Sequence, residues 1–306
     1  MRRFFLLPIA PALLATLFFT AAPVAAATAP RPTASFDAGS VHVDEYGTGS
    51  PALVLIPGLT DSGAVWDATV ARYQGTHTIY VLTLPGFGGR PAIAAPVLDT
   101  VTHDVAAFLP RANKPVLIGH SLGGFLAIRL AAEHGNLISG AIAVDGLPVF
   151  PGMDSLTQAQ RTSIADNGAS RIRSASPAAF DASEHQQIAY MTKPNNVATA
   201  ESFSKGASQD ATATYMQEML AADLRPQLSQ ITVPLMEIAP FDASVDAQNP
   251  YHPLASRAEK KAYYASLFAG DPTATVVTID DSRHFVMLDQ PAAFYAAVDA
   301  FLAKLG

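Results

Sequence analysis

Ser121 stands where a nucleophile could be exposed. It lies between Gly119 and Gly123, after an apolar run at residues 116–118 and before a helix-forming stretch at 125–133. A serine at a sharp strand-to-helix turn has its hydroxyl pushed out above the sheet, and the crowded backbone leaves no room for side chains two positions before and after it. The Gly-x-Ser-x-Gly pattern therefore predicts a serine nucleophile, whose weakly nucleophilic hydroxyl needs a base to take its proton.

Together with Ser121, three further motifs make the chain resemble the α/β-hydrolase family from about residue 35 to the C-terminus. One apolar strand ends at Pro57, which precedes a glycine and takes the place of the family's histidine. A second strand leads into the turn Thr-Leu-Pro-Gly-Phe-Gly, in which the first residue, Thr83, replaces the family's usual aspartate. Residues 281–287 resemble the catalytic-histidine loop. All four motifs occur in the family's order, so the resemblance implies the α/β-hydrolase fold.

The resemblance also implies which residue acts as the base. His284 follows the strand expected at 275–279 by a short loop and precedes a C-terminal helix that begins at Pro291. This is where the family delivers its histidine to the carboxyl edge of the sheet. We therefore expect His284 to take the proton of Ser121.

A carboxylate should complete the triad by holding the imidazole in the right tautomer and stabilising the imidazolium. In the family, an inserted cap is followed by a strand, and the usual acid comes after that strand. Here that strand is the one expected at 235–238, which points to Asp242. Asp246, one turn further on, is the first alternative. Asp145 is the second, because it follows the strand expected at 140–144 and some hydrolases of this fold place the acid there.

The resemblance places the oxyanion hole on two backbone N–H groups, those of Leu59 and Leu122. Two other titratable groups lie near the motifs. His120 adjoins the nucleophile, but strand geometry aims its side chain away from the hydroxyl, so we expect it to pack or to form a pocket wall. Glu237 lies in an apolar strand, where an unpaired charge is costly, and is expected to pair with a cation or to mark an exposed strand edge.

The elements that must position these residues are short apolar strands separated by helical patterns. Such strands predict an α/β protein with a mainly parallel sheet covered by helices on both faces. We expect the core to comprise residues 35–145 and 231–306. The strands are expected at residues 52–56, 78–82, 116–118, 140–144, 235–238 and 275–279.

Residues 146–230 lack a strand signal, and alanine, serine, glutamine and methionine dominate there. Within this stretch, residues 211–224 fit an amphipathic helix with one apolar face. We therefore expect 146–230 to form an inserted helical cap over the active site. Its methionines suit a pocket for varied apolar groups.

The N-terminal residues predict export. Two arginines precede an almost wholly apolar run at 4–20, and alanines at 25–27 form an A-x-A cleavage site. We expect residues 1–27 to be a secretory signal peptide, residues 28–34 a linker, and the mature protein to be periplasmic or extracellular. The alternative is an uncleaved membrane anchor, because the apolar run approaches the length that spans a bilayer.

Composition narrows the possible partners. The 306-residue chain is 49% hydrophobic and has no cysteine, which excludes thiolate metal sites and disulfides. Cleavage of the expected signal would remove two arginines and no acid, taking the formal net charge from -7 to -9. We expect no nucleic-acid partner and, after cleavage, no stable membrane insertion.

These features predict a carboxylic-ester hydrolase that works through an acyl-enzyme on a small-molecule ester, with no cofactor and no metal. Two alternatives remain. The same triad could serve another reaction of this fold, such as C–C bond hydrolysis or an aminopeptidase, lyase or perhydrolase reaction. The chain could also be a hydrolase-like ligand-binding module with little turnover.

Overall fold

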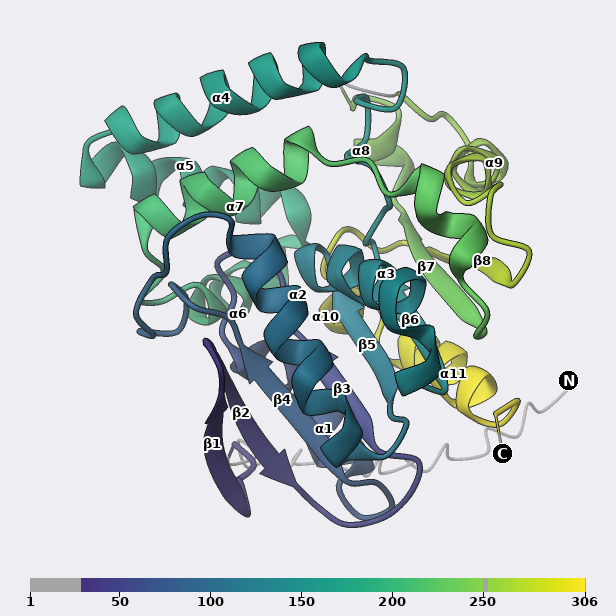
Figure 1. Ribbon diagram of the computed structural model, residues 1–306. Helices are drawn as coiled ribbons and strands as arrows, with labels where there is room; N and C mark the ends of the chain where they lie inside the picture. The colour runs from purple at the N-terminus through teal and green to yellow at the C-terminus, as the bar shows by residue number, and fades with distance from the viewer. Residues whose placement is uncertain (1–28, 250–252, 306) are drawn as a thin grey trace, which may run out of the picture.

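The structure is a computed structural model that describes residues 29–249 and 253–305 (Figure 1). The expected signal peptide at 1–27 lies outside the described residues. No helix in the described part of the chain combines the length and the apolar character needed to cross a bilayer.

An eight-stranded sheet forms the centre of the molecule, in the order β1-β2-β4-β3-β5-β6-β7-β8. The β1-β2 and β2-β4 pairs are antiparallel and all others are parallel, which confirms the predicted mainly parallel sheet. The strands β3 to β6 are buried along their whole length, as expected of a sheet covered on both faces. The strands are β1 (Ala34–Ala38), β2 (Val41–Tyr46), β3 (Leu53–Ile56), β4 (Ile79–Thr83), β5 (Val116–His120), β6 (Gly140–Val144), β7 (Leu235–Phe241) and β8 (Ala274–Asp280).

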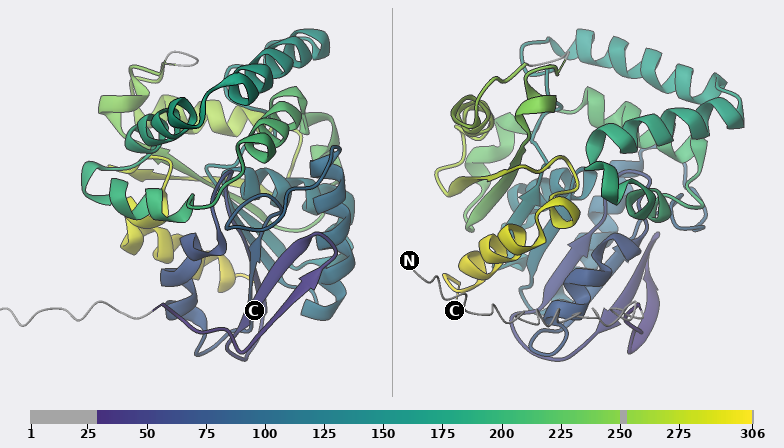
Figure 2. Two further views of the ribbon diagram at one scale, coloured as in Figure 1. Left: turned by 90° about the vertical axis from the view of Figure 1, so that its left-hand side faces the viewer. Right: turned by 180° about the vertical axis from the view of Figure 1, so that it is seen from behind.

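Helices cover both faces of this sheet. Successive strand side chains point to opposite faces, so Leu53 and Leu55 pack into one core cluster with Trp66, whereas Val54 and Ile56 pack into the other. Figure 2 shows the back of the molecule, where α11 runs across the sheet. The helices of the first cluster include α1 (Asp67–Tyr73) and α11 (Pro291–Leu302), and those of the second include α2 (Val97–Phe108), α3 (Leu122–His134) and α9 (Arg257–Leu267).

Four more helices lie between β6 and β7, in the stretch where the sequence predicts a cap, and gather at one end of the sheet (Figure 1). Of these, α4 and α7 pack along each other. The Glu218 carboxylate of α7 accepts hydrogen bonds from the N–H groups of Val97 and Leu98, each at 2.8 Å. This places a negative charge at the N-terminus of α2, where it is stabilised by the helix dipole. The helices are α4 (Gln158–Ser174), α5 (Pro177–Met191), α6 (Val197–Phe203) and α7 (Gln209–Ala221).

Candidate active site

Ser121 forms the sharp turn between β5 and α3. Its φ of 54° and ψ of -117° lie in a region that non-glycine residues rarely adopt, at a cost of about 1–3 kcal/mol. A Cβ on Gly119 would stand 2.0 Å from the Gly123 carbonyl oxygen, and one on Gly123 would stand 2.2 Å from the carbonyl oxygen of Ile56. The flanking glycines are therefore required by close backbone contact, as the sequence pattern predicts.

Two backbone N–H groups near this turn have no acceptor in the part of the chain that the structure describes. Leu122 is the first residue of α3, so its N–H has no acceptor within the helix, and Leu59 lies in the loop after β3. Within the described residues, neither N–H donates a hydrogen bond to another protein group. The loop after β3 approaches the nucleophile closely, because a Cβ on Gly58 would stand 3.3 Å from the Ser121 Cβ. These are the two N–H groups that the sequence predicts for the oxyanion hole.

His284 pairs with Asp145. The His284 Nδ1 lies 2.6 Å from the Asp145 Oδ2, although the two residues are 139 positions apart in the sequence. Asp145 directly follows β6, and His284 lies in the loop after β8. The two side chains keep 18% and 14% of their surface exposed, so the pair lies just below the molecular surface.

Asp145 is ionised in this pair. Burial raises the pKa of its carboxyl, but the hydrogen bond and the positive charge of His284 outweigh this effect and lower the pKa to about 2. An ionised carboxylate can only accept, so the Nδ1 of His284 carries the hydrogen and Nε2 remains the basic nitrogen. This is the tautomer that a general base for Ser121 requires.

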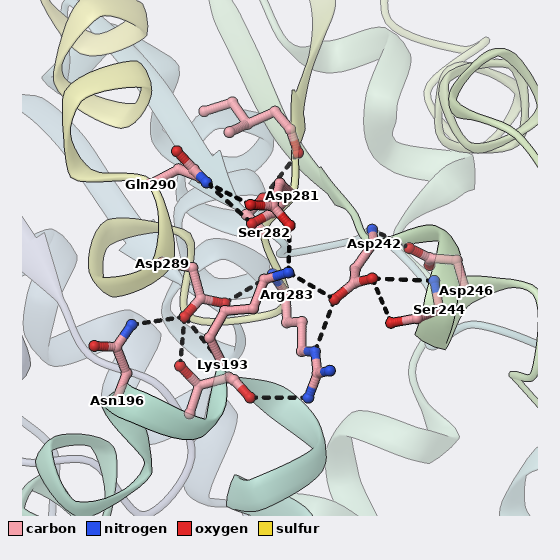
Figure 3. Close-up of polar contacts among 12 residues, drawn as sticks. Lys193, Asn196, Asp242, Ser244, Asp246, Asp281, Ser282, Arg283, Asp289 and Gln290 are labelled. Carbon is pink, nitrogen blue, oxygen red and sulfur yellow. Dashed lines mark hydrogen bonds and ion pairs between the residues drawn. The ribbon is translucent and has the colours of Figure 1, made fainter.

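The prediction that Asp242 orients His284 is wrong in the structure, because Asp242 is neutralised by other cations (Figure 3). Its Oδ2 lies 2.9 Å from the Arg283 Nε and 3.0 Å from the Lys193 Nζ. Its Oδ1 accepts hydrogen bonds from the N–H and the hydroxyl of Ser244. Burial raises the pKa of this carboxyl, but these donors lower it well below its usual range. Arg283, immediately before the expected base, takes the carboxylate at the family's usual position.

Asp246, the first alternative, does not contact His284 either. Its Oδ1 lies 2.7 Å from the Lys260 Nζ, and its Oδ2 accepts the N–H of Asp242 at 2.8 Å. Of the three candidate carboxylates, the structure brings only Asp145 to the histidine.

His120 supports the histidine loop from below. It is 1% exposed, and its ring centroid lies 4.6 Å from that of His284. Its Nε2 lies 3.1 Å from the His284 carbonyl oxygen and must donate, because a carbonyl only accepts. Burial lowers the pKa of this imidazole, which keeps it neutral. The role expected from the sequence, packing against the site, agrees with these contacts. Sequence reasoning missed Asp61, a buried neighbour whose Oδ2 lies 3.5 Å from the His120 Nδ1.

Glu237 is fully buried on β7, between β6 and β8, so the expectation of an exposed strand edge is wrong. Within the described residues it forms no ion pair, and neither oxygen has a well-formed hydrogen bond. Burial, and secondly the charge of Asp145, raise the pKa of Glu237 well above its ordinary value of 4.5. The Glu237 side chain is therefore a neutral acid behind the Asp145 carboxylate.

A recess of about 270 Å³ lies between α5 and the segment at 201–207. Glu184 of α5 lines it, and burial raises the pKa of this carboxyl. The lining combines apolar side chains such as Phe180 and Ile188 with titratable ones, which are Asp181, Glu184, His185, Glu201 and Lys205. Within residues 29–249 and 253–305, no group of three or more His, Cys, Asp or Glu side chains is arranged to hold a metal ion.

Part of the chain is similar in sequence to known esterases. Two curated relatives are named pimeloyl-[acyl-carrier protein] methyl ester esterase. The one from Aeromonas hydrophila subsp. hydrophila is 37% identical over 118 residues, which cover 38% of this chain and 45% of the relative. The one from Vibrio atlanticus is 32% identical over 109 residues, covering 36% and 40%. The matched stretch thus spans less than half the length of these relatives.

Solved structures show the same fold at low sequence identity. The enol-lactonase from Burkholderia xenovorans LB400 aligns with a TM-score of 0.67 and 18% identity, covering 86% of this chain and 96% of that one. A thermophilic esterase from Thermogutta terrifontis aligns with a TM-score of 0.68 and 20% identity, covering 87% and 93%. The sequence profile described as "Alpha/beta hydrolase family" matches residues 53–298. The chain belongs to the alpha/beta hydrolase family.

Proposed function

We propose that this protein is a serine hydrolase that cleaves carboxylic esters through an acyl-enzyme, with Ser121, His284 and Asp145 as its triad. The observation that carries the proposal is the 2.6 Å contact between the His284 Nδ1 and the Asp145 Oδ2. The strained turn at Ser121 and the free N–H groups of Leu59 and Leu122 support it. The names of the curated relatives, which are esterases, point to the same reaction.

Each group has one role in the proposed reaction. The Ser121 Oγ attacks the ester carbonyl while the His284 Nε2 takes its proton, and the two N–H groups bind the developing oxyanion. The imidazolium then protonates the leaving alcohol, and Asp145 stabilises the positive charge on the ring meanwhile. Water, activated by the same imidazole, attacks the acyl-enzyme and releases the acid with Ser121 restored.

The proposed substrate is a small-molecule ester with a short or medium acyl chain. The relatives' printed names specify a methyl ester. We propose methyl and other small alkoxy groups as leaving groups for this chain as well.

Turnover of 4-nitrophenyl esters, measured beside the matching anilides, tests this function. We expect hydrolysis of the esters with short and medium acyl chains, and a loss of kcat of about 10⁴-fold or more in Ser121→Ala, because the nucleophile is gone. Ser139→Ala is the matched control: its hydroxyl donates to the Lys114 carbonyl, at the other end of the sheet. Circular dichroism should show both variants folded. Undiminished turnover in Ser121→Ala would contradict the proposal, and an inactive wild type would favour a binding module.

A further inference from the structure

The two oxygens of the Asp145 carboxylate have different partners. Oδ2 contacts the His284 Nδ1 at 2.6 Å, and Oδ1 accepts a short hydrogen bond from the Tyr264 hydroxyl. Tyr264 lies on α9, which packs against β7 and β8, and is only 3% exposed. This hydroxyl contacts the carboxylate oxygen that the histidine leaves free, and no motif in the sequence identifies it.

A second donor matters because a single hydrogen bond does not fix a carboxylate. The terminal torsion of an aspartate is broad and roughly two-fold, so the plane of the group can rotate about the bond to its Cβ. Asp145 is also held in a left-handed backbone conformation, with a φ of 47°, at the end of β6. With Oδ1 held by Tyr264, the other oxygen stays directed at the imidazole.

The tyrosine is itself held in place. α9 begins with a capping box, in which Ser256 accepts the Glu259 N–H and Glu259 accepts the Ser256 N–H. One turn before Tyr264, the Lys260 Nζ lies 4.8 Å from its ring centroid and pairs with Asp246 at 2.7 Å. The lysine therefore packs against the ring while its charge is balanced by Asp246.

The charges around the hydroxyl keep it a donor. Its ionisable neighbours are Asp145, Glu237 and Asp246, with Lys260 and Tyr263 on its own helix, the ring of Tyr263 in edge contact with that of Tyr264. Burial, and then the negative charge of Asp145, raise the pKa of Tyr264 well above its ordinary value of 10. Ionised Asp145 can only accept, so the tyrosine donates throughout the pH range in which an esterase is assayed.

We propose that Tyr264 is a positioning residue of the active site: its hydroxyl fixes the Asp145 carboxylate so that one oxygen faces His284. The inference rests on the proposed function, in which Asp145 orients the base. It assigns to α9 a part in the triad that neither the Gly-x-Ser-x-Gly turn nor the histidine loop supplies.

The test compares Tyr264→Phe with Tyr263→Phe. Tyr263 is a matched control because its hydroxyl contacts Asp154 and the Gly152 N–H, away from the triad. We expect Tyr264→Phe to lower kcat on a nitrophenyl ester about tenfold with KM nearly unchanged, the size of effect of one hydrogen bond to a charged group. Tyr263→Phe should retain the wild-type kcat.

A pH profile separates positioning from a general structural effect. Without the tyrosine, the Asp145 carboxylate can rotate away from the ring and stabilises the His284 imidazolium less. The acid limb of kcat/KM should therefore move to lower pH in Tyr264→Phe. With 3-fluorotyrosine at position 264, which keeps both a donor hydroxyl and the packing, it should stay near the wild-type position.

An NMR titration of the His284 ring gives a readout that needs no turnover. If the wild type hydrolyses no ester, the proposed function fails, yet the His284 pKa should still fall in Tyr264→Phe. The inference is overturned if Tyr264→Phe keeps both the wild-type kcat and the wild-type His284 titration. It is also overturned if Tyr263→Phe shifts both to the same extent.

Discussion

Single carboxyl groups near the site differ in charge because their surroundings differ. Asp145 is ionised, with a pKa of about 2, because its contact with His284 outweighs the cost of burial. Glu237, on the neighbouring strand, has no such partner among the described residues and is neutral. Because Glu237 is neutral, the Asp145 carboxylate faces the imidazole without repulsion from a second buried negative charge.

The raised pKa of Glu237 predicts a pH-dependent stability. An unfolded glutamate loses its proton near pH 4.5, whereas the folded one keeps it to a much higher pH. The protonated Glu237 therefore makes its full contribution to the free energy of unfolding below pH 4.5, and this contribution is lost as the pH rises through the pKa of the folded state. Glu237→Gln removes this loss, so the variant should melt above the wild type at pH 8, by about 2–4 °C per kcal/mol gained.

Thermal melts at pH 4 and pH 8 check this expectation. Glu133→Gln is the control, because Glu133 lies at the surface beside Arg129. The difference between Glu237→Gln and the wild type should widen from pH 4 to pH 8, and that for Glu133→Gln should stay constant. A Glu237→Gln difference that is the same at both pH values would show that Glu237 is charged in the folded protein.

At the residue scale, local patterns predict part of the site. Ser121 can be predicted because backbone crowding at its turn demands two nearby glycines, and His284 because a strand, a loop and a helix follow one another around it. The acid cannot be predicted in this way. Asp242 follows its strand as the family's acid does, and only the folded chain brings Arg283 and Lys193 to it.

At the scale of elements, a polar network joins the segment after α5 to the histidine loop (Figure 3). The Asp289 carboxylate, in α10 (Val286–Asp289), accepts the Thr192 hydroxyl at 2.7 Å and the N–H groups of Lys193 and Arg283 at 3.0 and 2.9 Å. Arg283 also donates to the Thr192 carbonyl at 3.0 Å. The network fixes the loop that carries the base against the helical region above the sheet.

The buried carboxylate of this network should contribute more to the free energy of unfolding than the exposed one. Asp242 is 9% exposed and pairs with both Lys193 and Arg283, whereas Asp281 is 75% exposed and, among the described residues, forms an ion pair with Lys193 only. Asp242→Asn should lower the free energy of unfolding by roughly 3 kcal/mol, because it leaves the partly buried Arg283 without its counter-ion and Lys193 with the exposed Asp281 only. Asp281→Asn should change it by less than about 1 kcal/mol.

Urea denaturation of the two variants, each beside the wild type, measures this difference. Equal losses in Asp242→Asn and Asp281→Asn would contradict the account of the network. No loss in either variant would contradict it as well.

The parallel part of the sheet could be predicted from the sequence, whereas the two strands at its antiparallel edge could not. The buried strands are continuous apolar runs, and their order along the chain implied a mainly parallel sheet. The strands β1 and β2 lie outside the motifs and are not continuous apolar runs: β1 has no buried residue, and β2 mixes buried with half-buried ones. The contact of α9 with the site depends on tertiary packing alone.

At the scale of the whole molecule, the fold brings distant parts of the chain to one edge. Ser121, Asp145 and His284 follow β5, β6 and β8, respectively. These strands and β7, which lies between β6 and β8, are all parallel, so the carboxyl ends of the strands lie at the same edge of the sheet. Export stays a prediction from the sequence, since the expected signal peptide lies outside the described residues. The charge of the chain, -7 before any cleavage, suits a small-molecule substrate better than a polyanion.

The most direct measurement compares kcat for a 4-nitrophenyl ester in Asp145→Asn and Asp242→Asn, with folding of each checked by circular dichroism. Asp145→Asn should lower kcat by about 10⁴-fold, because an amide would hold His284 in the wrong tautomer. Asp242→Asn should stay within about tenfold of the wild type, because Asp242 binds Arg283 and Lys193 and not the base. A large loss in Asp242→Asn with an active Asp145→Asn would contradict the triad assigned to this protein.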